Sequence, residues 1–474
     1  MSRRPYPLFE NVEILDAGAE GKAIARVNDL VVFVSFAVPG DIVDIQVVAR
    51  KKSFCEGKIL RFHKYSERRT EPFCSHFGTC GGCKWQNMPY EDQLKFKQKQ
   101  VDDNFTRIGK FSFPAIREIL ASPLTTEYRN KLEFTFSNRR WLDYADMQLP
   151  AEERQMNALG FHIPQLFDRV LAIDHCYLQP EPSNHIRLAV RDYALQNSLS
   201  FYDARNHTGF LRNMLIRNTT TGHVMVIVVF GEEKKEAIAG LLEFISERFP
   251  EVTSLMYVIN LKHNDVITDL ETFLRKGDPF ILEEMPPATE GGKPLNFKIG
   301  PVSFYQTNPL QAFHLYRTVF EFAGFQGHEL VYDLYCGTGT ISNFVASSVA
   351  KVVGIEYVPS AIEDAHENSV LNGIANTVFY AGDLAKLLDA GFVRENGQPD
   401  VIITDPPRSG MHEKVIEQIL EIAPGKVVYV SCNPATQARD IALMNEKYEV
   451  AAVQPVDMFP HTHHVENVVL LRRR

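Results

Sequence analysis

The sequence predicts an α/β protein with a parallel sheet in its C-terminal part and a small β-barrel at its N-terminal end. From about residue 300 the chain repeats strand, loop and helix, an order that builds a parallel sheet. The first part of the chain instead holds short strand patterns separated by turn residues, as in small barrels. The length of 474 residues suggests roughly three domains. We expect them at 1–63, 64–290 and 291–474.

The composition is that of an ordinary globular chain, with 45% apolar and 23% charged residues. Wholesale disorder and a coiled-coil rod are therefore excluded. No apolar run reaches the roughly 18 residues that a membrane helix needs, and no apolar secretory stretch follows the first residues. We expect a cytoplasmic protein without a membrane partner, and a monomer by default.

Five strands are expected in the barrel, at residues 12–15, 23–27, 30–34, 42–48 and 57–62. Although the net charge of -9 argues against a uniformly basic protein, basic residues gather between Lys51 and Thr70 and again at Lys95, Lys97 and Lys99. Such patches fit a protein that meets a polyanion on one face. Solvated surface charges are the simpler alternative, and the charges alone do not decide between them.

A helix is predicted over residues 93–110. Its apolar face would carry Leu94, Val101, Phe105 and Ile108, while its outer face would carry Lys95, Lys99 and Asp102. Residues 120–280 alternate strand-like and helix-like stretches, and the turn-rich stretch 285–294 indicates a hairpin or connector.

A Gly-rich turn follows the predicted strand that begins at Leu330. Gly337 and Gly339 let the backbone approach a ligand closely. Glu356, at the end of the next strand, is placed to accept the hydroxyls of a ribose. Because Ser342 stands where a third glycine would be, and Asp333 precedes the turn, the pattern favours S-adenosylmethionine over a dinucleotide.

Three later loops supply further polar groups at the predicted strand ends. Asp383 follows the third strand and is placed to reach an adenine ring. Asp405 opens a proline-stiffened loop that faces the ligand crevice. Arg408 follows the two prolines, where adenine methyltransferases carry an aromatic residue, and so argues against that class.

Cys432 lies just past the fifth strand, which makes it a candidate nucleophile. A buried, inert thiol is the alternative, and it is the role we expect for Cys336 inside the Gly-rich turn. His461, His463 and His464 lie close together, but no other ligand type flanks them, so a metal site is disfavoured. Glu466 is the better candidate for a proton acceptor.

Five segments together resemble the RNA uracil-5-methyltransferase family, in particular its bacterial 23S rRNA branch. They are Phe304–Asn308, Asp333–Gly339, Asp405–Arg408, Ser431–Pro434 and His464–Glu466. The resemblance covers nearly the whole chain. It implies an N-terminal TRAM domain, which is a barrel of the oligonucleotide-binding type, a central α+β domain and a Rossmann-like methyltransferase domain.

The resemblance also implies an activity, namely methyl transfer from S-adenosylmethionine to C5 of a uridine in 23S rRNA. Cys432 would add to C6 of the uracil, and Glu466 would remove the C5 proton. The cofactor contacts would be Gln306, Tyr335, Glu356 and Asp405, with Asp383 a less secure addition. Arg408 is our own hypothesis for stabilising the enolate oxygen. The target base has to leave its stack to be reached.

Three of the seven cysteines, Cys74, Cys80 and Cys83, lie within ten residues. Cys55 and Cys176 are the remaining candidates for a fourth metal ligand, and the resemblance indicates Cys176. It also favours a [4Fe-4S] cluster with a structural, RNA-facing role. Zinc is the rival, although this spacing lacks the paired knuckles of structural zinc sites.

Three alternatives remain at this point. A transfer RNA substrate is one, although that branch commonly lacks the barrel and the cysteine segment. RNA cytosine-5 methylation is another, but its nucleophile typically follows a proline in the loop where Arg408 stands. The third is a non-catalytic ribosome-assembly factor, against which the intact Cys432, Glu466 and Asp405 argue.

Overall fold

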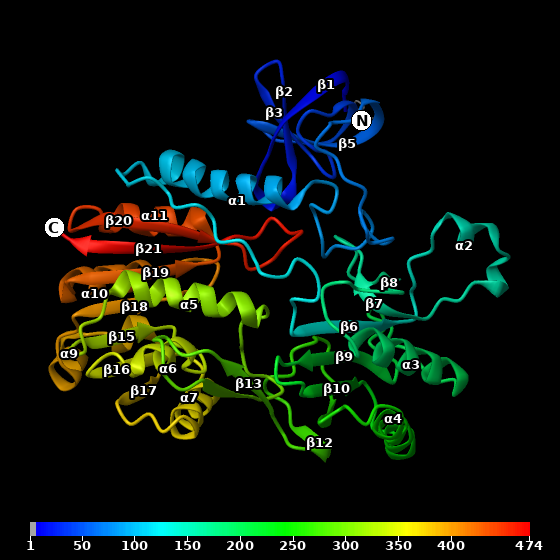
Figure 1. Ribbon diagram of the computed structural model, residues 1–474. Coiled ribbons are helices and arrows are strands. Elements are labelled where there is room, and N and C mark those ends of the chain that lie inside the picture. The colour runs from blue at the N-terminus through cyan, green and yellow to red at the C-terminus, as the bar shows by residue number, and fades with distance from the viewer. Residues whose placement is uncertain (1–5) are drawn as a thin grey trace.

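The computed structural model describes residues 6–474. Three parts follow one another along the chain: an N-terminal barrel, a central mixed sheet and a C-terminal sheet (Figure 1). The predicted α/β class and the order of its parts are confirmed. Within residues 6–474, no helix combines the length and the apolar character that crossing a membrane requires.

The N-terminal part is a closed five-stranded barrel in the order β1-β2-β3-β5-β4. Its strands are β1 (Leu8–Ala17), β2 (Ala23–Val27), β3 (Leu30–Val34), β4 (Ile42–Arg50) and β5 (Phe54–Lys64). Alternate valines, isoleucines and alanines fill its interior, and Cys55 is completely buried among them. The predicted barrel is therefore confirmed, and Cys55 belongs to its core.

The central part is a seven-stranded sheet in the order β12-β11-β10-β9-β6-β7-β8. Its strands are β6 (Lys131–Ser137), β7 (Ala158–His162), β8 (Val170–Ala172), β9 (Leu211–Asn218), β10 (Val224–Phe230), β11 (Ser254–Ile259) and β12 (Thr272–Gly277). The helices of this part are α2 (Tyr144–Gln148), α3 (Ser183–Gln196) and α4 (Lys235–Arg248). The apolar stripes of α3 and α4 pack on one face of the sheet and leave the polar residues of β6 and β9 on the other.

The C-terminal part contains a second seven-stranded sheet, in the order β17-β16-β15-β18-β19-β21-β20. Its strands are β15 (Leu330–Leu334), β16 (Lys351–Glu356), β17 (Thr377–Ala381), β18 (Val401–Thr404), β19 (Lys426–Ser431), β20 (Tyr448–Val456) and β21 (Glu466–Arg473). The first five strands of that order are parallel. Strand β21 runs antiparallel to β19, and the edge strand β20 runs antiparallel to β21. The predicted parallel sheet is therefore present, and the antiparallel strand near its edge was not predicted.

Helices cover both faces of this sheet. They are α5 (Pro309–Ala323), α6 (Thr340–Ala346), α7 (Pro359–Leu371), α8 (Leu384–Leu387), α9 (Ala390–Asn396), α10 (Glu413–Ile422) and α11 (Pro434–Met444). Residues of α5 and α6 join the core on one face. Residues of α8 to α11 join the core on the other. The edge at which the parallel strands end therefore lies between these two cores.

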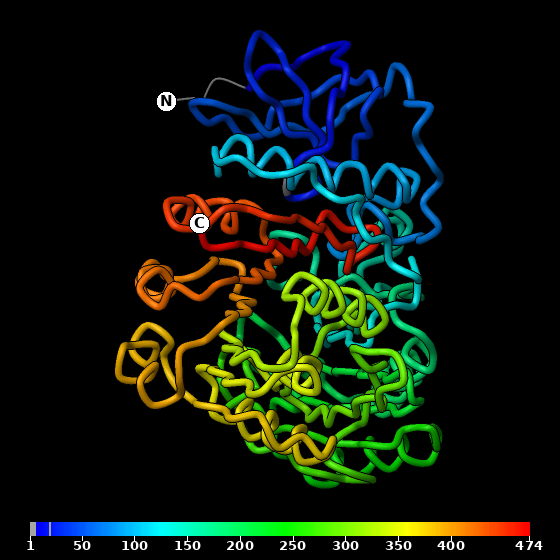
Figure 2. The backbone as a smooth tube through the Cα atoms, turned by 60° about the vertical axis from the view of Figure 1, so that its left-hand side comes forward, coloured from blue at the N-terminus to red at the C-terminus, as the bar shows by residue number. Residues whose placement is uncertain are grey.

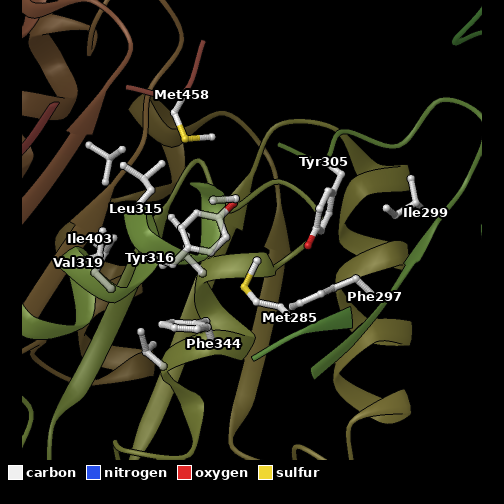
Figure 3. Packing of buried hydrophobic residues seen from close by; sticks show 14 of the residues in the cluster. Met285, Phe297, Ile299, Tyr305, Leu315, Tyr316, Val319, Phe344, Ile403 and Met458 are labelled. Atoms are coloured by element: carbon white, nitrogen blue, oxygen red, sulfur yellow. The ribbon is translucent and has the colours of Figure 1, made fainter. Parts of the chain in front are cut away.

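A hairpin of β13 (Ile281–Met285) and β14 (Leu295–Ile299) joins the two sheets, so the predicted turn-rich connector is a hairpin. Figure 3 shows Met285 and Phe297 of this hairpin beside Tyr305, with Tyr316 and Phe344 next to them. The rings of Phe297 and Tyr305 lie 5.8 Å apart. This core supports the segment that continues into Gln306.

Helix α1 (Tyr90–Asn104) lies between the barrel and the C-terminal strands β20 and β21 in both views (Figures 1 and 2). It ends in a π-helical turn over Phe105–Gly109, close to the predicted end. Val101 and Phe105 are buried as expected, but Ile108 is 46% exposed. Because the helical geometry changes at this turn, Ile108 does not continue the buried face of the helix.

Lys97 is not a surface charge, contrary to its assignment to a basic patch. Its ammonium lies 2.5 Å from Asp457 Oδ1 and also donates to the carbonyl of Phe459 at 3.0 Å. Both side chains of the pair are fully buried. Tyr90 donates to the other oxygen of Asp457 at 2.8 Å, so α1 holds the loop that precedes Glu466.

Candidate active site

The C-terminal edge of the parallel sheet gathers most of the predicted site residues. Tyr335 follows β15, Glu356 ends β16, Asp405 follows β18 and Cys432 follows β19. Because these strands are parallel neighbours, their carboxyl ends share one edge. Glu466 begins β21, which runs antiparallel to β19 and therefore enters the sheet at the same edge.

The Gly-rich turn after β15 adopts left-handed backbone conformations at three positions. Gly337 and Gly339 have φ of 54° and 73°, and Tyr335 has φ of 62°, which is strained for a residue with a side chain. A Cβ atom at Gly337 would meet nothing within 4 Å. Glu356 Oε2 accepts the Gly337 N–H at 3.2 Å and holds the turn. The turn is therefore fixed and leaves space beside its backbone.

Asp333 lies beneath this turn and is completely buried. One carboxyl oxygen accepts the Ser342 hydroxyl at 2.6 Å, whereas Oδ1 is buried without a partner. Burial raises the pKa of Asp333 to about 7, and the charge of Glu356 acts in the same direction. Ser342, which stands where a dinucleotide turn has its third glycine, thus holds the Asp333 carboxyl group. The buried Oδ1 of Asp333, which has no partner, suits a cationic group of a ligand.

The segment Phe304–Asn308 lies against this turn, where Thr338 donates to the carbonyl of Phe304 at 3.2 Å. Asn130 of the central part holds the segment from the other side. Its side chain donates to the carbonyl of Gln306 at 3.1 Å, and its backbone N–H donates to that of Thr307 at 2.8 Å. Gln306 is buried. The two sheets therefore meet at the segment that carries a predicted cofactor contact.

Glu356 and Asp383 both take part in local structure. The second oxygen of Glu356 accepts the Val358 N–H at 3.0 Å. Asp383 caps α8 through the Ala385 N–H at 3.1 Å and lies 3.4 Å from the ammonium of Lys386. A carboxylate has about four acceptor positions, so both residues retain capacity for a ligand.

Cys432 and Glu466 are brought together by strand register. Ser431 of β19 pairs with Asn467 of β21, so one step further along the ladder Cys432 is opposite Glu466. Cys432 is half-buried and Glu466 is buried. The antiparallel strand at the end of the chain thus delivers a carboxyl group beside the thiol.

Asn433 links the thiol loop to the loop of Asp405. Its side chain caps α11 through the Ala435 N–H at 3.1 Å and donates to the carbonyl of Arg408 at 3.0 Å. Thr436 donates to the same carbonyl at 3.3 Å. These bonds hold the backbone of Arg408, whose side chain is exposed, next to Cys432.

Burial and mutual repulsion raise the pKa values of the acidic groups at this edge. Burial raises the pKa of Cys432 to about 11, with contributions from the charges of Glu466 and Asp405. Burial and the charge of Asp405 raise the pKa of Glu466 to about 8. Burial and the charge of Asp333 raise that of Asp405 to about 7. Arg408 lowers the pKa values of both Cys432 and Glu466, so it favours the ionised forms of the pair.

The three histidines near Glu466 serve the packing of their loop. Gln93 of α1 accepts the His461 N–H at 2.8 Å, and its amide nitrogen lies 3.2 Å from His461 Nδ1. Burial lowers the pKa values of His461 and His463 to about 4 and of His464 to about 3, so the rings are neutral. Cys336 packs against Ile362, Ala365 and Phe379, as expected.

Four cysteines line a single cavity of about 290 Å³ beside the central sheet: Cys74, Cys80, Cys83 and Cys176. Cys176 thus lines the same cavity as the other three, whereas Cys55 lies in the barrel. All the cysteines are free. Burial raises the pKa of Cys83 to about 12 and that of Cys176 to about 11, and neighbouring thiolates act in the same direction.

The four thiols do not converge on one point. Over residues 6–474, no three His, Cys, Asp or Glu side chains have the geometry that holds a single metal ion. A zinc ion would need its thiolates about 2.3 Å from a common centre.

Two supporting residues were missed by sequence reasoning. Asn433 had a signal, because an asparagine before a proline at the start of a helix is a typical N-cap. Asn130 had none, since its partners Gln306 and Thr307 are distant in sequence.

The chain is similar to known proteins along most of its length. Residues 280–474 match the family described as tRNA (uracil-5-)-methyltransferase, and residues 10–60 match the TRAM domain. An uncharacterized RNA methyltransferase of Bacteroides thetaiotaomicron is 56% identical over 459 residues, which cover 96% of this chain and all of that protein. One from Porphyromonas gingivalis is 53% identical over 475 residues, covering 98% of this chain and 99% of that protein.

A similar fold occurs in the crystal structure of Pyrococcus abyssi tRNA (uracil-54, C5)-methyltransferase in complex with S-adenosyl-L-homocysteine. The TM-score is 0.73 and the sequence identity 26%, and the match covers 97% of this chain and 100% of that chain.

Proposed function

Because the chain belongs to the RNA (uracil-5-)-methyltransferase family and is an S-adenosylmethionine-dependent RNA uracil-C5 methyltransferase, we propose that Cys432 and Glu466 carry this reaction on a uridine of 23S rRNA. The observation that carries the proposal is the pairing of β19 with β21, which sets the thiol opposite a buried carboxyl group. A non-catalytic role in ribosome assembly is set aside, since the chain belongs to an enzyme class.

The proposed roles follow from the chemistry of uracil. C5 is too weak a nucleophile to attack a methyl sulfonium directly. The Cys432 thiolate forms a bond to C6, and the electron pair of the C5–C6 double bond passes into an enolate that is nucleophilic at C5. After C5 has gained the methyl group, Glu466 takes the C5 proton and the C6–S bond breaks, which restores the ring and the thiolate.

Arg408 is proposed to balance the negative charge that develops during these steps. It lowers the pKa values of both Cys432 and Glu466, and its backbone is held by Asn433 and Thr436. A guanidinium at this position favours the thiolate before addition and the enolate oxygen after it. Its exposed side chain leaves it free to meet the RNA.

S-adenosylmethionine supplies an electrophilic methyl group when bound. The residues proposed to hold it are Gln306, Tyr335, Glu356, Asp383 and Asp405. Two observations support a site here: the open space beside Gly337 and the unpartnered buried oxygen of Asp333. Binding of S-adenosylhomocysteine by calorimetry tests this set, with Glu356→Gln expected to weaken it and Tyr144→Ala, distant on α2, expected to leave it unchanged.

The cysteine cavity is proposed to hold a [4Fe-4S] cluster on Cys74, Cys80, Cys83 and Cys176. Support comes from the cavity that the four cysteines share and from a sequence spacing that lacks the paired knuckles of structural zinc sites. Iron, acid-labile sulfide and zinc should be measured on protein purified without oxygen. Iron and sulfide that vanish in Cys80→Ser but persist in Cys55→Ala would support the cluster, and stoichiometric zinc would contradict it.

The choice of 23S rRNA over transfer RNA rests on the barrel and the cysteine segment, which the transfer-RNA branch commonly lacks, but a match to a tRNA enzyme over 97% of this chain weighs against it. The relative of known structure from Pyrococcus abyssi acts on tRNA, so this choice needs a direct test. We further expect the enzyme to be cytoplasmic and monomeric. Light scattering of the purified protein would check the monomeric state.

The decisive assay offers labelled S-adenosylmethionine with unmodified transcripts of 23S rRNA and of transfer RNA, separately. Wild type and Cys432→Ala are compared, and mass spectrometry identifies and maps the labelled nucleoside. Label in 5-methyluridine of 23S rRNA, absent with the variant, is the expected result. Label confined to transfer RNA would overturn the substrate and leave the mechanism intact.

A further inference from the structure

A second large cavity lies in the central part, away from the methyl-transfer site. It has a volume of about 740 Å³, within the range of pockets that bind small molecules. Its floor is formed by Thr135 of β6 and Asn213 of β9, which are directly paired across the two strands. Its walls come from the loops 201–208 and 260–265 and from the turn between β7 and β8. We call it the β6–β9 pocket.

The walls of the β6–β9 pocket are fixed before any ligand arrives. Arg212 is 1% exposed, and its guanidinium donates to the carbonyls of Asn260 at 2.8 Å and Asn264 at 3.0 Å and to the carboxylate of Asp265 at 2.8 Å. Asp203 holds the other loop by accepting backbone N–H groups, among them that of Arg205 at 2.9 Å. Buried polar anchors of this kind are typical of preorganised binding sites.

Flat aromatic rings face the opening of the pocket. The rings of His207 and His263 stack at 4.2 Å with an angle of 5° between them, one ring from each loop. Phe167 is 67% exposed, although it lies in the pocket lining. Tyr202 lies under the Arg212 guanidinium at 4.3 Å. Exposed π faces next to polar groups are what single-stranded nucleic-acid sites use to stack bases.

The charges of the pocket are already balanced. Arg205 pairs with Asp168, and Arg212 pairs with Asp265. The lining, which lies wholly in the described part of the chain, contains no lysine, and its two arginines each already face a carboxylate. The uncharged hydrogen-bonding groups of the lining include the amide of Asn213, the hydroxyls of Thr135 and Ser137, and the rings of the three lining histidines. Amides and hydroxyls suit the edge of a neutral base better than a phosphate.

One face of β6 connects the pocket to the methyl-transfer site. Lys131, Glu133, Thr135 and Ser137 alternate along that face, and the seven residues from first to last span about 20 Å. At the near end Lys131 is paired directly with Arg217 of β9. Arg217 donates to the carbonyl of Ser303 at 2.7 Å, directly before the segment that carries Gln306. This face of β6 therefore runs from the pocket to the contact between the two sheets at Ser303.

We propose that the β6–β9 pocket binds an unpaired nucleobase of the RNA substrate, a few nucleotides from the uridine that is methylated. The base stacks against the exposed rings of Phe167 and His207, and its edge bonds to Asn213 and Thr135. This second anchor sets the position of the target uridine along the strand. The proposal rests on RNA being the substrate, but not on which RNA it is.

Phe167→Ala and His207→Ala test the proposal, because both side chains are exposed and their loss leaves the buried anchors intact. Tyr144→Ala serves as the matched control, since Tyr144 is a 76% exposed aromatic in the same part of the chain but outside the pocket. The substrate is whichever transcript wild type labels. Folding is checked by thermal melting, and the methyl-transfer site by binding of S-adenosylhomocysteine.

The double variant should raise the KM for the transcript about tenfold or more, with kcat changed far less. With a short oligoribonucleotide that ends two nucleotides to either side of the target uridine, the same variant should equal wild type. An unchanged KM on the long transcript, or an equal loss on both RNAs, would overturn the proposal. Loss of S-adenosylhomocysteine binding in the double variant would contradict it as well, since the pocket would then act through the methyl-transfer site.

Ultraviolet crosslinking of the wild-type complex gives an independent readout. Digestion and mass spectrometry should find a nucleotide attached to a peptide that contains Phe167 or Tyr202. Crosslinks confined to the barrel and the methyl-transfer edge would count against an RNA base in the pocket. Inactivity of Cys432→Ala tests the proposed mechanism separately, so failure of one proposal does not imply failure of the other.

Discussion

The catalytic edge and the cysteine cavity both raise the pKa values of cysteine thiols by burial, yet their surroundings differ. Cys432 is surrounded by Glu466, Asp405 and the exposed Arg408, groups that exchange protons or balance charge. The cavity thiols face one another and apolar side chains, together with the polar side chains of His76, Gln86, Arg129, His162 and His175. Among the residues that line the cavity, all of them described by the structure, there is no carboxylate.

This difference separates two uses of a buried thiol. A thiol beside a carboxyl group and a cation can ionise, react and be released in one cycle. Thiols without a neighbouring carboxylate ionise when a bound cation stabilises them, and then remain ionised. We therefore expect the edge to carry turnover and the cavity to carry structure, and the predictions below test this division.

The largest expected effect is that of Cys432→Ala. Loss of the thiol removes the bond to C6, so kcat should fall by at least about 1,000-fold while RNA binding persists. Transfer of labelled methyl to RNA measures the rate, and filter binding measures the affinity. Cys55→Ala, which changes a thiol in the barrel core, should retain activity. Substantial turnover by Cys432→Ala would assign the nucleophile elsewhere.

Glu466→Gln should slow turnover by about 100-fold to 10,000-fold, because an amide cannot take the C5 proton. Addition and methyl transfer precede that step, so the variant should accumulate RNA joined to protein through Cys432. The adduct would appear as a slower band on a denaturing gel. The double variant with Cys432→Ala provides the control, and an adduct that survives in it would refute this order of events.

The sequence predicted these two residues because each belongs to a short motif at a strand end, where parallel sheets bind ligands. It also predicted the barrel, since β2 and β3 are bounded by turn residues on both sides. The burial of Lys97 could not be predicted. Lys95, Lys97 and Lys99 look alike locally, and only Lys97 meets Asp457, which lies 360 positions along the chain. The β6–β9 pocket was also missed, because its walls come from separate loops.

Cys80→Ser tests the structural role of the cysteine cavity. If the cavity carries structure, this variant should lose bound metal and melt at a lower temperature, because metal binding is coupled to folding. The kcat of the remaining folded enzyme should stay within about threefold of wild type. Metal analysis, thermal melting and methyl transfer are measured on the same sample. A loss of kcat with unchanged melting would give the cavity a part in turnover.

The pH dependence of activity distinguishes the two regions further. Glu466 has to be ionised to accept a proton, and its pKa is raised to about 8. The rate should therefore rise as the pH increases through 8. Asp405→Asn removes a charge that raises the pKa values of Glu466 and Cys432, so the rise should move to lower pH. A midpoint unchanged by this substitution would exclude Glu466 as the group that titrates.

The smallest expected effect is on stability. Because the pKa of Glu466 is higher in the folded protein than in the unfolded chain, the folded state binds more protons between about pH 4 and pH 8. Stability linked to this group is present below that window and is lost as the pH rises through it. Glu466→Gln should therefore stabilise the protein at pH 8 by on the order of 2 kcal/mol, with little effect at pH 4. Denaturant unfolding at the two pH values measures the difference.

The account depends most on the bond between Cys432 and C6 of the target uracil. The direct measurement uses a transcript made with 5-fluorouridine, whose C5 fluorine Glu466 cannot remove as a proton. After incubation with S-adenosylmethionine and digestion, mass spectrometry should find a methylated fluorouridine nucleotide attached to the peptide that contains Cys432. A nucleotide attached to another residue, or no adduct from an enzyme that methylates the ordinary transcript, would contradict the account.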